Sequence, residues 1–322
     1  MSGVERIERF TCFGGTCGVI VAGDGPARSA TEAAARARLR LLEWHGQFSR
    51  FEPGSELSRL NADQREWIPV SPLMAYFAAT ARYAADLTGG LVDATLLEEI
   101  RQAGYREELP PRLPLELTLA LAPRRRTASG SPQRRWQALE ADTRSASVTR
   151  PPGLQLDSGG LAKGLFADLL AEELADHDTF AVDCGGDLSI GGAAGLARPI
   201  EVQSPFDQSV LHTFELAGTG VATSGIGRRA WLGADGLPAH HLLDPATGRP
   251  AFTGVVQATA LAPSAVLAEI HAKAAVLSGP ADGSRWLRWG GVLVLDDGSH
   301  RVIEPAGSRR GSVASPSLAA AA

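Results

Sequence analysis

The sequence predicts an α+β fold. Expected strands and helices are mixed along the chain without the regular strand–helix alternation that builds a parallel sheet. The 36 glycines and 20 prolines indicate many turns, and no internal repeat is present. With 322 residues, the chain is long enough to bury a substantial hydrophobic core.

Helical patterns dominate the first part of the chain. A glycine-bearing strand is expected at residues 11–23, followed by an Ala- and Arg-rich helix at 31–44 with Ser29 or Thr31 as its cap. A second long helix is expected at 72–88, because its apolar residues recur at helical spacing and a glycine pair follows it.

Short strands and turns dominate the second part. Strands are expected at 136–140, 147–149, 155–157, 180–184, 200–202 and 213–216. Ser158 is expected to cap a helix at 161–174, and another helix is expected at 264–277. A hairpin is expected within 291–304, turned by an Asp-Gly pair.

Two segments are expected to lie outside the compact fold. Residues 106–135 are rich in Pro and Arg, and they are interpreted either as a solvated loop or as a surface for a target protein. Residues 306–322 are rich in Ser, Ala and Gly, which is typical of a disordered tail. The sequence therefore predicts one domain at 1–305 and a tail at 306–322.

Composition argues against several classes of partner. The formal net charge of −5 gives no electrostatic case for nucleic acid or an anionic membrane. No window approaches the roughly 18 uninterrupted apolar residues of a membrane span. The first ten residues lack an apolar region, so no export signal is expected. Cys12, Cys17 and Cys184 are interpreted as reduced thiols, which favours a cytoplasmic protein.

A Gly-rich motif stands at 157–164, with the sequence Asp-Ser-Gly-Gly-Leu-Ala-Lys-Gly. It runs from an expected strand into an expected helix. Its glycines let the backbone approach a ligand closely, and the N–H groups at the start of a helix suit a phosphate. Lys163 adds a cation one turn into the helix. The alternative is an ordinary strand-to-helix turn.

Three further motifs follow in order along the chain. They are Asp-Cys-Gly-Gly-Asp at 183–187, Ala-Thr-Ser-Gly at 222–225 and His-His-Leu-Leu-Asp-Pro-Ala-Thr-Gly-Arg-Pro at 240–250. Asp187 is a candidate to accept hydrogen bonds from ligand hydroxyls or to hold a partner group, and the alternative for its motif is an ordinary turn at the end of a strand. Arg228 and Arg229, just after the second of these motifs, either pair with phosphate or are solvated. His241 is either a structural histidine or a base that takes a proton from an attacking hydroxyl.

Glu269 and Lys273 stand four residues apart on the last expected long helix. They form either a surface ion pair or part of the ligand site.

Taken together, these motifs resemble those of the ApbE family, the FAD:protein FMN transferases. The resemblance covers roughly residues 13–300 and keeps the family's order. Three more motifs support it: Gly-Gly-Thr at 14–16, Phe-Ser-Arg-Phe-Glu-Pro-Gly-Ser-Glu-Leu-Ser-Arg-Leu-Asn at 48–61, and Thr-Gly-Gly-Leu-Val-Asp at 88–93. It implies a helical N-terminal part packed on a β-rich C-terminal part, with FAD in the cleft between them.

The resemblance also implies an activity. Such a protein cleaves FAD, attaches FMN through a phosphoester to a Ser or Thr of an acceptor flavoprotein, and releases AMP. The implied partners are therefore FAD and an acceptor protein. The alternatives are an FAD pyrophosphatase that yields FMN and AMP, and a non-enzymatic FAD-binding protein whose metal site has degenerated.

Site residues are carried over by position from the family's motifs. The implied catalytic residues are His241, as base, and Asp187 beside the site. The implied flavin-nucleotide contacts are Gly14, Phe51, Leu91, Val92, Asp93, Asp157, Lys163 and Leu243. The implied magnesium positions are Gly160, Glu269, Ala272 and Lys273.

The sequence departs from the family at the metal positions. The family has Asp where this chain has Glu269, and Thr where it has Lys273. Glutamate can still bind magnesium, whereas a protonated lysine cannot. The departure predicts that Lys273 supplies part or all of the metal's charge, with weak metal dependence or with FAD binding and little turnover. Val92, where Phe is usual, is a milder change.

Overall fold

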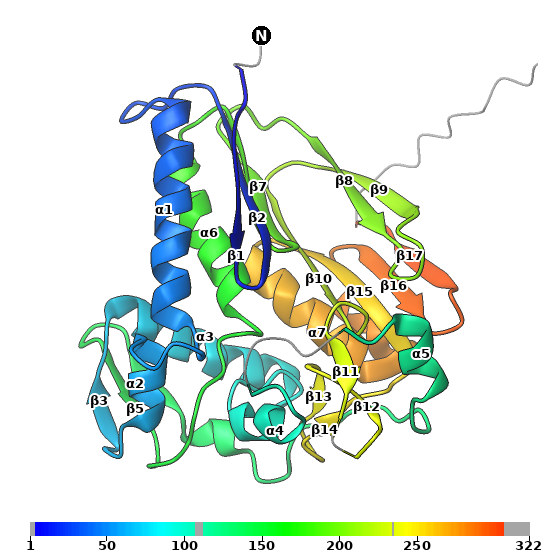
Figure 1. Cartoon of the computed structure of the whole chain (residues 1–322). Helices are drawn as coiled ribbons and strands as arrows, with labels where there is room; N and C mark the ends of the chain where they lie inside the picture. Colours follow the sequence, from blue (N-terminus) through cyan, green and yellow to red (C-terminus); the bar gives the residue numbers. More distant parts are fainter. Residues whose placement is uncertain (1–3, 107–111, 234, 306–322) are drawn as a thin grey trace, which may run out of the picture.

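An eight-stranded sheet forms the centre of the molecule (Figure 1). The computed structural model describes residues 4–106, 112–233 and 235–305. In spatial order the strands are β1 (Arg6–Cys12), β2 (Gly15–Ala22), β6 (Thr179–Cys184), β7 (Asp187–Gly191), β10 (Thr219–Gly225), β15 (Val255–Ala262), β16 (Gly291–Leu295) and β17 (His300–Ile303). All pairings in this sheet are antiparallel. Because helices pack on an antiparallel sheet, the predicted α+β class is confirmed.

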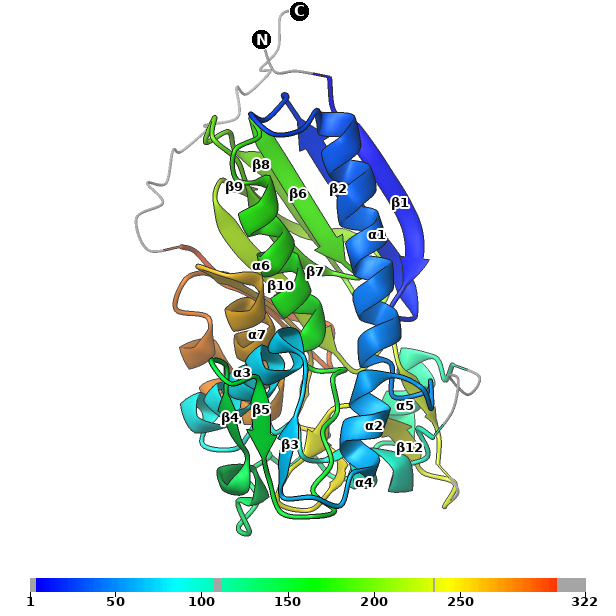
Figure 2. The ribbon, with the colours of Figure 1, turned by 90° about the vertical axis from the view of Figure 1, so that its left-hand side faces the viewer.

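The two faces of the sheet are covered differently. One face carries the helices α1 (Ala30–Phe48), α6 (Ala162–Leu174) and α7 (Ala265–Asp282) (Figure 2). The other carries a two-stranded ribbon of β8 (Arg198–Gln203) and β9 (Val210–Leu216). Successive residues of β6 show the division, since side chains alternate between faces. Val182 belongs to the same core cluster as Phe166 of α6, whereas Ala181 belongs to the cluster that contains Phe214 of the ribbon.

Shorter elements form the lower part of the molecule in Figures 1 and 2. They comprise α2 (Glu56–Ala62), α3 (Pro72–Thr88), α4 (Leu97–Gln102), α5 (Leu115–Ala120) and a small sheet of β3 (Trp67–Pro69), β5 (Ser147–Thr149) and β4 (Glu140–Asp142). Two ribbons, β11 (Ala230–Leu232) with β12 (Pro238–His240) and β13 (Leu243–Asp244) with β14 (Arg249–Pro250), complete this part. The 3₁₀ turns are η1 (Arg135–Ala138) and η2 (Gly283–Trp286).

Most of the predicted helices are confirmed. The α1 helix begins after Ser29, whose hydroxyl accepts from the Glu32 N–H while the Glu32 side chain binds back, a capping box. The α3 helix ends at Gly89, which adopts the left-handed conformation (φ 62°). The predicted helices at 161–174 and 264–277 correspond to α6 and α7, and the last predicted hairpin to β16 and β17.

The predicted strand at 11–23 is wrong in its bounds, because it is a hairpin of two strands that turns at Phe13 and Gly14. Its second strand, β2, pairs with β6, more than 150 residues later by the numbering. Residues 6–22 therefore belong to the central sheet rather than to the helical N-terminal part. Long-range pairing of this kind leaves no local pattern in the sequence.

Two other strand predictions are wrong. Residues 155–157 do not join a ladder, because the Asn61 side chain binds both the N–H and the C=O of Leu156, at 2.7 and 2.8 Å. Residues 136–140 contain most of η1 and only the first residue of β4. No strand is predicted at β7, β10 or β15, which lie in the middle of the sheet.

The ends of the predicted domain are only partly visible. The predicted tail at 306–322 lies outside the described residues, so the boundary at residue 305 stays a prediction. Part of the predicted excursion at 106–135 is described, and it contains α5 and the start of η1. Among the helices that the structure describes, none has the length and apolarity needed to cross a membrane.

Close contact between α6 and α7 depends on Gly164. A Cβ at this position would lie 2.7 Å from the Cα of Val266, closer than real contacts allow. Asp168 of α6 then caps α7, since its carboxylate accepts from the N–H groups of Ala265 and Val266 at 2.7 and 2.9 Å. The two helices are thus held together at their N-terminal ends.

Replacing this glycine is expected to destabilise the fold. Gly164→Ala should lower the free energy of unfolding by about 1–3 kcal/mol, because the methyl group overlaps the α7 backbone. Urea denaturation measures the change. Gly46→Ala is the matched control: Gly46 is exposed within α1 and a Cβ there meets nothing within 4 Å. That variant should gain stability by up to about 1 kcal/mol. Equal behaviour of the two variants would contradict the packing argument.

Candidate active site

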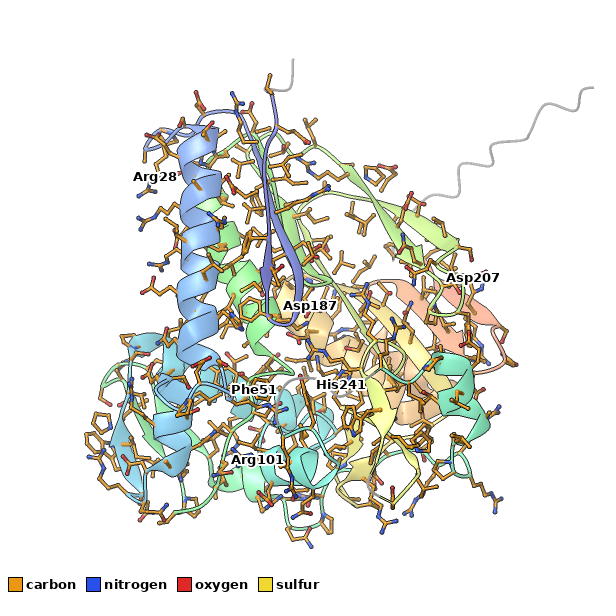
Figure 3. All side chains as sticks on the ribbon, in the orientation of Figure 1. Arg28, Phe51, Arg101, Asp187, Asp207 and His241 are labelled. Atoms are coloured by element: carbon orange, nitrogen blue, oxygen red, sulfur yellow. The ribbon has the colours of Figure 1, made fainter. Side chains whose placement is uncertain are left out.

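A cavity of about 630 Å³ lies where the upper and lower parts of the molecule meet. Figure 3 labels Phe51, His241 and Asp187 near the middle of the view, in this region. Of the residues predicted for the site, those that line the cavity are Gly14, Phe51, Leu91, Val92, Asp93, Asp157, Gly160, Lys163, His241, Leu243 and Lys273. Asp187, Glu269 and Ala272 are buried and do not line it. The cavity is large enough for a nucleotide-sized ligand.

The Gly-rich segment at the cavity is fixed from both sides. Asn61, at the end of the 48–61 motif, holds Leu156 through the two hydrogen bonds described above. The N–H of Asp157 then donates to the C=O of Ala94 at 2.8 Å. Ser158 does not cap α6 as predicted, because its hydroxyl donates to the C=O of Phe48 at 2.9 Å. Although α6 has no side-chain cap in the described structure, the N–H groups of Ala162 and Gly164 in its first turn already donate, to the C=O of Ser158 and to Glu269, both at 3.0 Å.

An aromatic cluster forms one wall of the cavity. The Arg50 guanidinium lies 4.6 Å from the ring centroid of Phe51 and 4.3 Å from that of Tyr105. Its Nε also lies 3.4 Å from the Asp157 carboxylate, which orients it. Neither Tyr105 nor Arg50 was predicted individually. Arg50 lies inside the motif at 48–61, whereas no pattern in the sequence marks Tyr105.

The loop after α3 presents Leu91, Val92 and Asp93 to the cavity. The N–H of Val92 donates to the hydroxyl of Thr88 at 3.0 Å, which ties the loop to the end of the helix. Asp93 accepts from the N–H and the hydroxyl of Thr95, at 2.8 and 2.7 Å. Burial raises the pKa of Asp93 above its ordinary value. This loop is therefore shaped by its own side chains.

The two candidate arginines differ in position. Arg229 lines the cavity, and its Nη2 donates to the C=O of Phe13 at 3.0 Å, in the turn that also carries Gly14. Gly14 has φ 69°, a left-handed conformation that favours glycine at this turn. Arg228 is exposed. Arg229 is thus placed to pair with an anionic ligand, in keeping with the first of the two alternatives.

Four charged side chains form a row beside the cavity, in the order Asp187, Lys163, Glu269 and Lys273. Lys163 contacts Asp187 directly, and its Nζ lies 3.9 Å from Glu269 Oε1. The Nζ of Lys273 donates to the same oxygen at 2.8 Å. Glu269 Oε2 accepts from the N–H of Gly164 at 3.0 Å. The α6–α7 contact at Gly164 therefore also assembles this charged row.

Burial and mutual attraction set the pKa values in the row. Burial raises the pKa of Asp187 to about 6, with repulsion from Glu269 adding to the effect and the lysines opposing it. For Lys163, burial opposes the charge, but attraction by Asp187 and Glu269 outweighs it and raises the pKa. For Glu269, burial is outweighed by Lys273 and Lys163, so the pKa is lowered. Asp187, Lys163 and Glu269 are therefore charged at neutral pH.

His241 stands before a tight turn that fixes its backbone. Asp244 accepts from the N–H groups of Ser129 and Ala246, at 3.0 and 3.1 Å, and from the hydroxyl of Thr247 at 3.1 Å. The Nδ1 of His241 is buried and has no hydrogen-bond partner among the described residues. A buried polar atom costs free energy unless it is paired, so this nitrogen suits a ligand or substrate atom.

The environment of His241 keeps its imidazole neutral. Burial lowers the pKa well below the ordinary value, and the positive charge of Arg229 adds to the effect. The lysines of the row act in the same direction. A neutral imidazole at physiological pH can accept a proton, which is what a general base requires.

The residues at the predicted metal positions do not fit a magnesium ion. Both oxygens of Glu269 already accept hydrogen bonds, from Lys273 and Gly164. Lys273 is a cation and has no lone pair to offer. Ala272 lies in the hydrophobic core. The described residues hold no group of three or more His, Cys, Asp or Glu side chains that could bind a metal ion.

The fold and the motifs at the cavity agree with comparisons to known proteins. A model of the ApbE family matches residues 13–294, so the chain belongs to the ApbE family. The FAD:protein FMN transferase of Rhodobacter capsulatus is 28% identical over 303 residues, which are 91% of this chain and 56% of the relative. The chain thus spans little more than half the length of that relative.

Two further proteins extend the comparison. The FAD:protein FMN transferase of Vibrio cholerae serotype O1 is 30% identical over 253 residues, covering 76% of this chain and 73% of the relative. The solved structure of the ApbE protein from Thermotoga maritima superposes with a TM-score of 0.75 at 24% identity, covering 93% of this chain and 97% of that one. The fold is therefore shared along almost the whole chain.

Removing Lys163 is expected to leave buried carboxylates without a counter-charge. Lys163→Met should lower the free energy of unfolding by about 3 kcal/mol at pH 7. Without the ammonium, the pKa of Asp187 in the folded state rises further above the unfolded value. The loss of unfolding free energy therefore has its full size above the pKa that Asp187 has in the folded variant. It shrinks as the pH falls toward the pKa that Asp187 has in the unfolded chain.

Urea denaturation at pH 7 and about pH 5 tests this expectation. Arg285→Met is the control, because Arg285 is 60% exposed and its partner Asp282 is 3.9 Å away. That change should cost at most about 0.5 kcal/mol at either pH. A loss for Lys163→Met that is equally small would mean that the row is not a strongly coupled network.

Proposed function

We propose that this protein is an FAD:protein FMN transferase. It cleaves FAD, attaches FMN through a phosphoester to a Ser or Thr of an acceptor flavoprotein, and releases AMP. Membership of the ApbE family and the relatives named as FAD:protein FMN transferases support the proposal. Cytoplasmic location, expected from the sequence, stays a prediction.

One observation carries the proposal. A neutral His241, with a buried ring nitrogen that lacks a partner in the described structure, shares a cavity with Lys163 and the start of α6. A base is thus placed beside a cationic group of the kind that binds phosphate. The aromatic wall of Phe51 and Tyr105 offers apolar surface for the ring system of a flavin nucleotide.

The proposed reaction is an exchange at the FMN-side phosphorus of FAD. The acceptor hydroxyl oxygen forms a bond to this phosphorus, and its proton passes to His241. The bond from the phosphorus to the bridging oxygen breaks, and that oxygen leaves with AMP. Lys163 and Arg229 stabilise the negative charge that develops on the phosphate oxygens, and Asp187 orients Lys163. We assign the nucleotide contacts to the predicted residues that line the cavity.

A non-enzymatic FAD-binding protein is the alternative that a specific observation favours, because the metal positions do not fit magnesium. A pyrophosphatase, in which water replaces the acceptor hydroxyl, uses the same groups. The three functions differ in what they release and modify. The transferase labels the acceptor covalently, the pyrophosphatase releases AMP without an acceptor, and the binding protein does neither.

A transfer assay tests the proposal. The protein is incubated with FAD and an FMN-binding acceptor domain that carries a candidate Ser or Thr, and AMP release and covalent flavin fluorescence of the acceptor are followed. His241→Asn should lower the transfer rate by about 10²–10⁴-fold while FAD still binds. His300→Asn, at an exposed position on β17, is the control and should keep the wild-type rate. Bound FAD with neither AMP nor labelled acceptor would overturn the transferase assignment.

The pH dependence of the rate follows from the pKa directions. His241 must be neutral, and Asp187 must be ionised to balance Lys163. The pKa of His241 is well below 6.5, and that of Asp187 is raised to about 6. The value of kcat/KM should therefore fall only as the pH drops through about 6 or lower. A pH–rate profile whose acid limb lies above pH 6.5 would contradict these assignments.

A further inference from the structure

The chain contains two lysines, Lys163 and Lys273, among 31 basic residues. Both belong to the charged row beside the cavity, and both contact or approach the same oxygen of Glu269. All the other residues in this Lys and Arg count are therefore arginines. An ammonium is a compact point charge, whereas a guanidinium is a wide planar fork, so the two are not interchangeable at a narrow site.

Lys273 reaches the cavity past Gly160. A Cβ on Gly160 would lie 3.3 Å from Cε of Lys273, so the glycine leaves room for the lysine stem beside the Gly-rich segment. The side chain is 11% exposed and lines the cavity, while Glu269 behind it is fully buried. The ammonium is thus anchored on one side by Glu269 and faces the ligand space on the other.

We propose that the Lys273 ammonium, held by Glu269 and admitted by Gly160, is a built-in cation for the FAD pyrophosphate that takes the place of a divalent metal. This inference rests on the proposed function and makes it specific: FAD binding at this site needs no magnesium. Lys273 acts together with Lys163, from the neighbouring helix, on the same phosphate groups.

The charges of the row support this assignment. Two carboxylates and two ammonium groups cancel, so the row does not attract a divalent cation, and Lys273 repels one. Without Lys273 the row would carry a net charge of −1, and Glu269 Oε1 would be left with only the more distant Lys163, 3.9 Å away. Such a site would repel the pyrophosphate and attract a cation. The identity of residue 273 therefore decides whether the site binds the pyrophosphate directly or attracts a metal cation first.

FAD affinity, measured by quenching of flavin fluorescence, tests the inference independently of turnover. The wild-type protein should bind FAD with the same Kd, within about twofold, in chelator and in millimolar magnesium. Lys273→Thr should weaken binding in chelator by about 10–100-fold, the value of one charge-assisted contact, and magnesium should restore part of it. Lys273→Arg is the matched variant that keeps the charge, and because a guanidinium is wider than an ammonium it should bind FAD in chelator less tightly than the wild type but more tightly than Lys273→Thr.

A second measurement covers the case in which Lys273→Thr does not fold. With two lysines in the chain, ¹⁵N-lysine NMR of the wild-type protein can resolve two Nζ signals, which Lys273→Arg assigns. FAD added in chelator should shift the Lys273 signal, and magnesium alone should not. Wild-type FAD affinity that falls more than about tenfold in chelator, or an unshifted Lys273 signal on FAD binding, would overturn the inference. Absence of FAD binding under both conditions would overturn the proposed function as well, whereas binding that needs magnesium leaves the transferase assignment intact.

Discussion

The contact between α6 and α7 is the constraint on which the site depends. Gly164 lets the two helix backbones meet, and Asp168 then accepts from the first N–H groups of α7. Glu269 reaches back to the N–H of Gly164. Because of this contact, Lys163 on one helix and Glu269 on the other lie within reach of each other. A wider separation would leave buried charges unpaired, which is costly in a low-dielectric interior.

Around this contact, the cavity is built from loops that are fixed by side-chain hydrogen bonds. Asn61 holds the segment before Asp157, Thr88 holds the loop that carries Val92, and Asp244 holds the turn after His241. Each of these residues lies in one of the sequence motifs but does not line the cavity. The motifs thus encode both the ligand-facing side chains and the bonds that position them.

In the proposed site, the charged row takes the part that a bound metal ion would take. Lys273 is a cation tethered to α7, and its Nζ donates to Glu269 Oε1 at 2.8 Å. Ala272 and Ala274 of the same helix lie in the hydrophobic core, so α7 both packs in the core and carries the charged pair.

The sequence by itself determined the family, the order of the motifs, the long helices and a set of site residues, most of which line the cavity. These features depend on local patterns, such as the Ser29 cap and the glycines after α3, which are legible over a few residues. The tertiary structure alone decided that residues 6–22 join the central sheet, that Leu156 binds Asn61 rather than a neighbouring strand, and that Tyr105 faces Arg50. Each of these contacts joins segments that are far apart in the chain or depends on how two loops meet. Such contacts arise from tertiary packing and leave no periodic pattern in the local sequence.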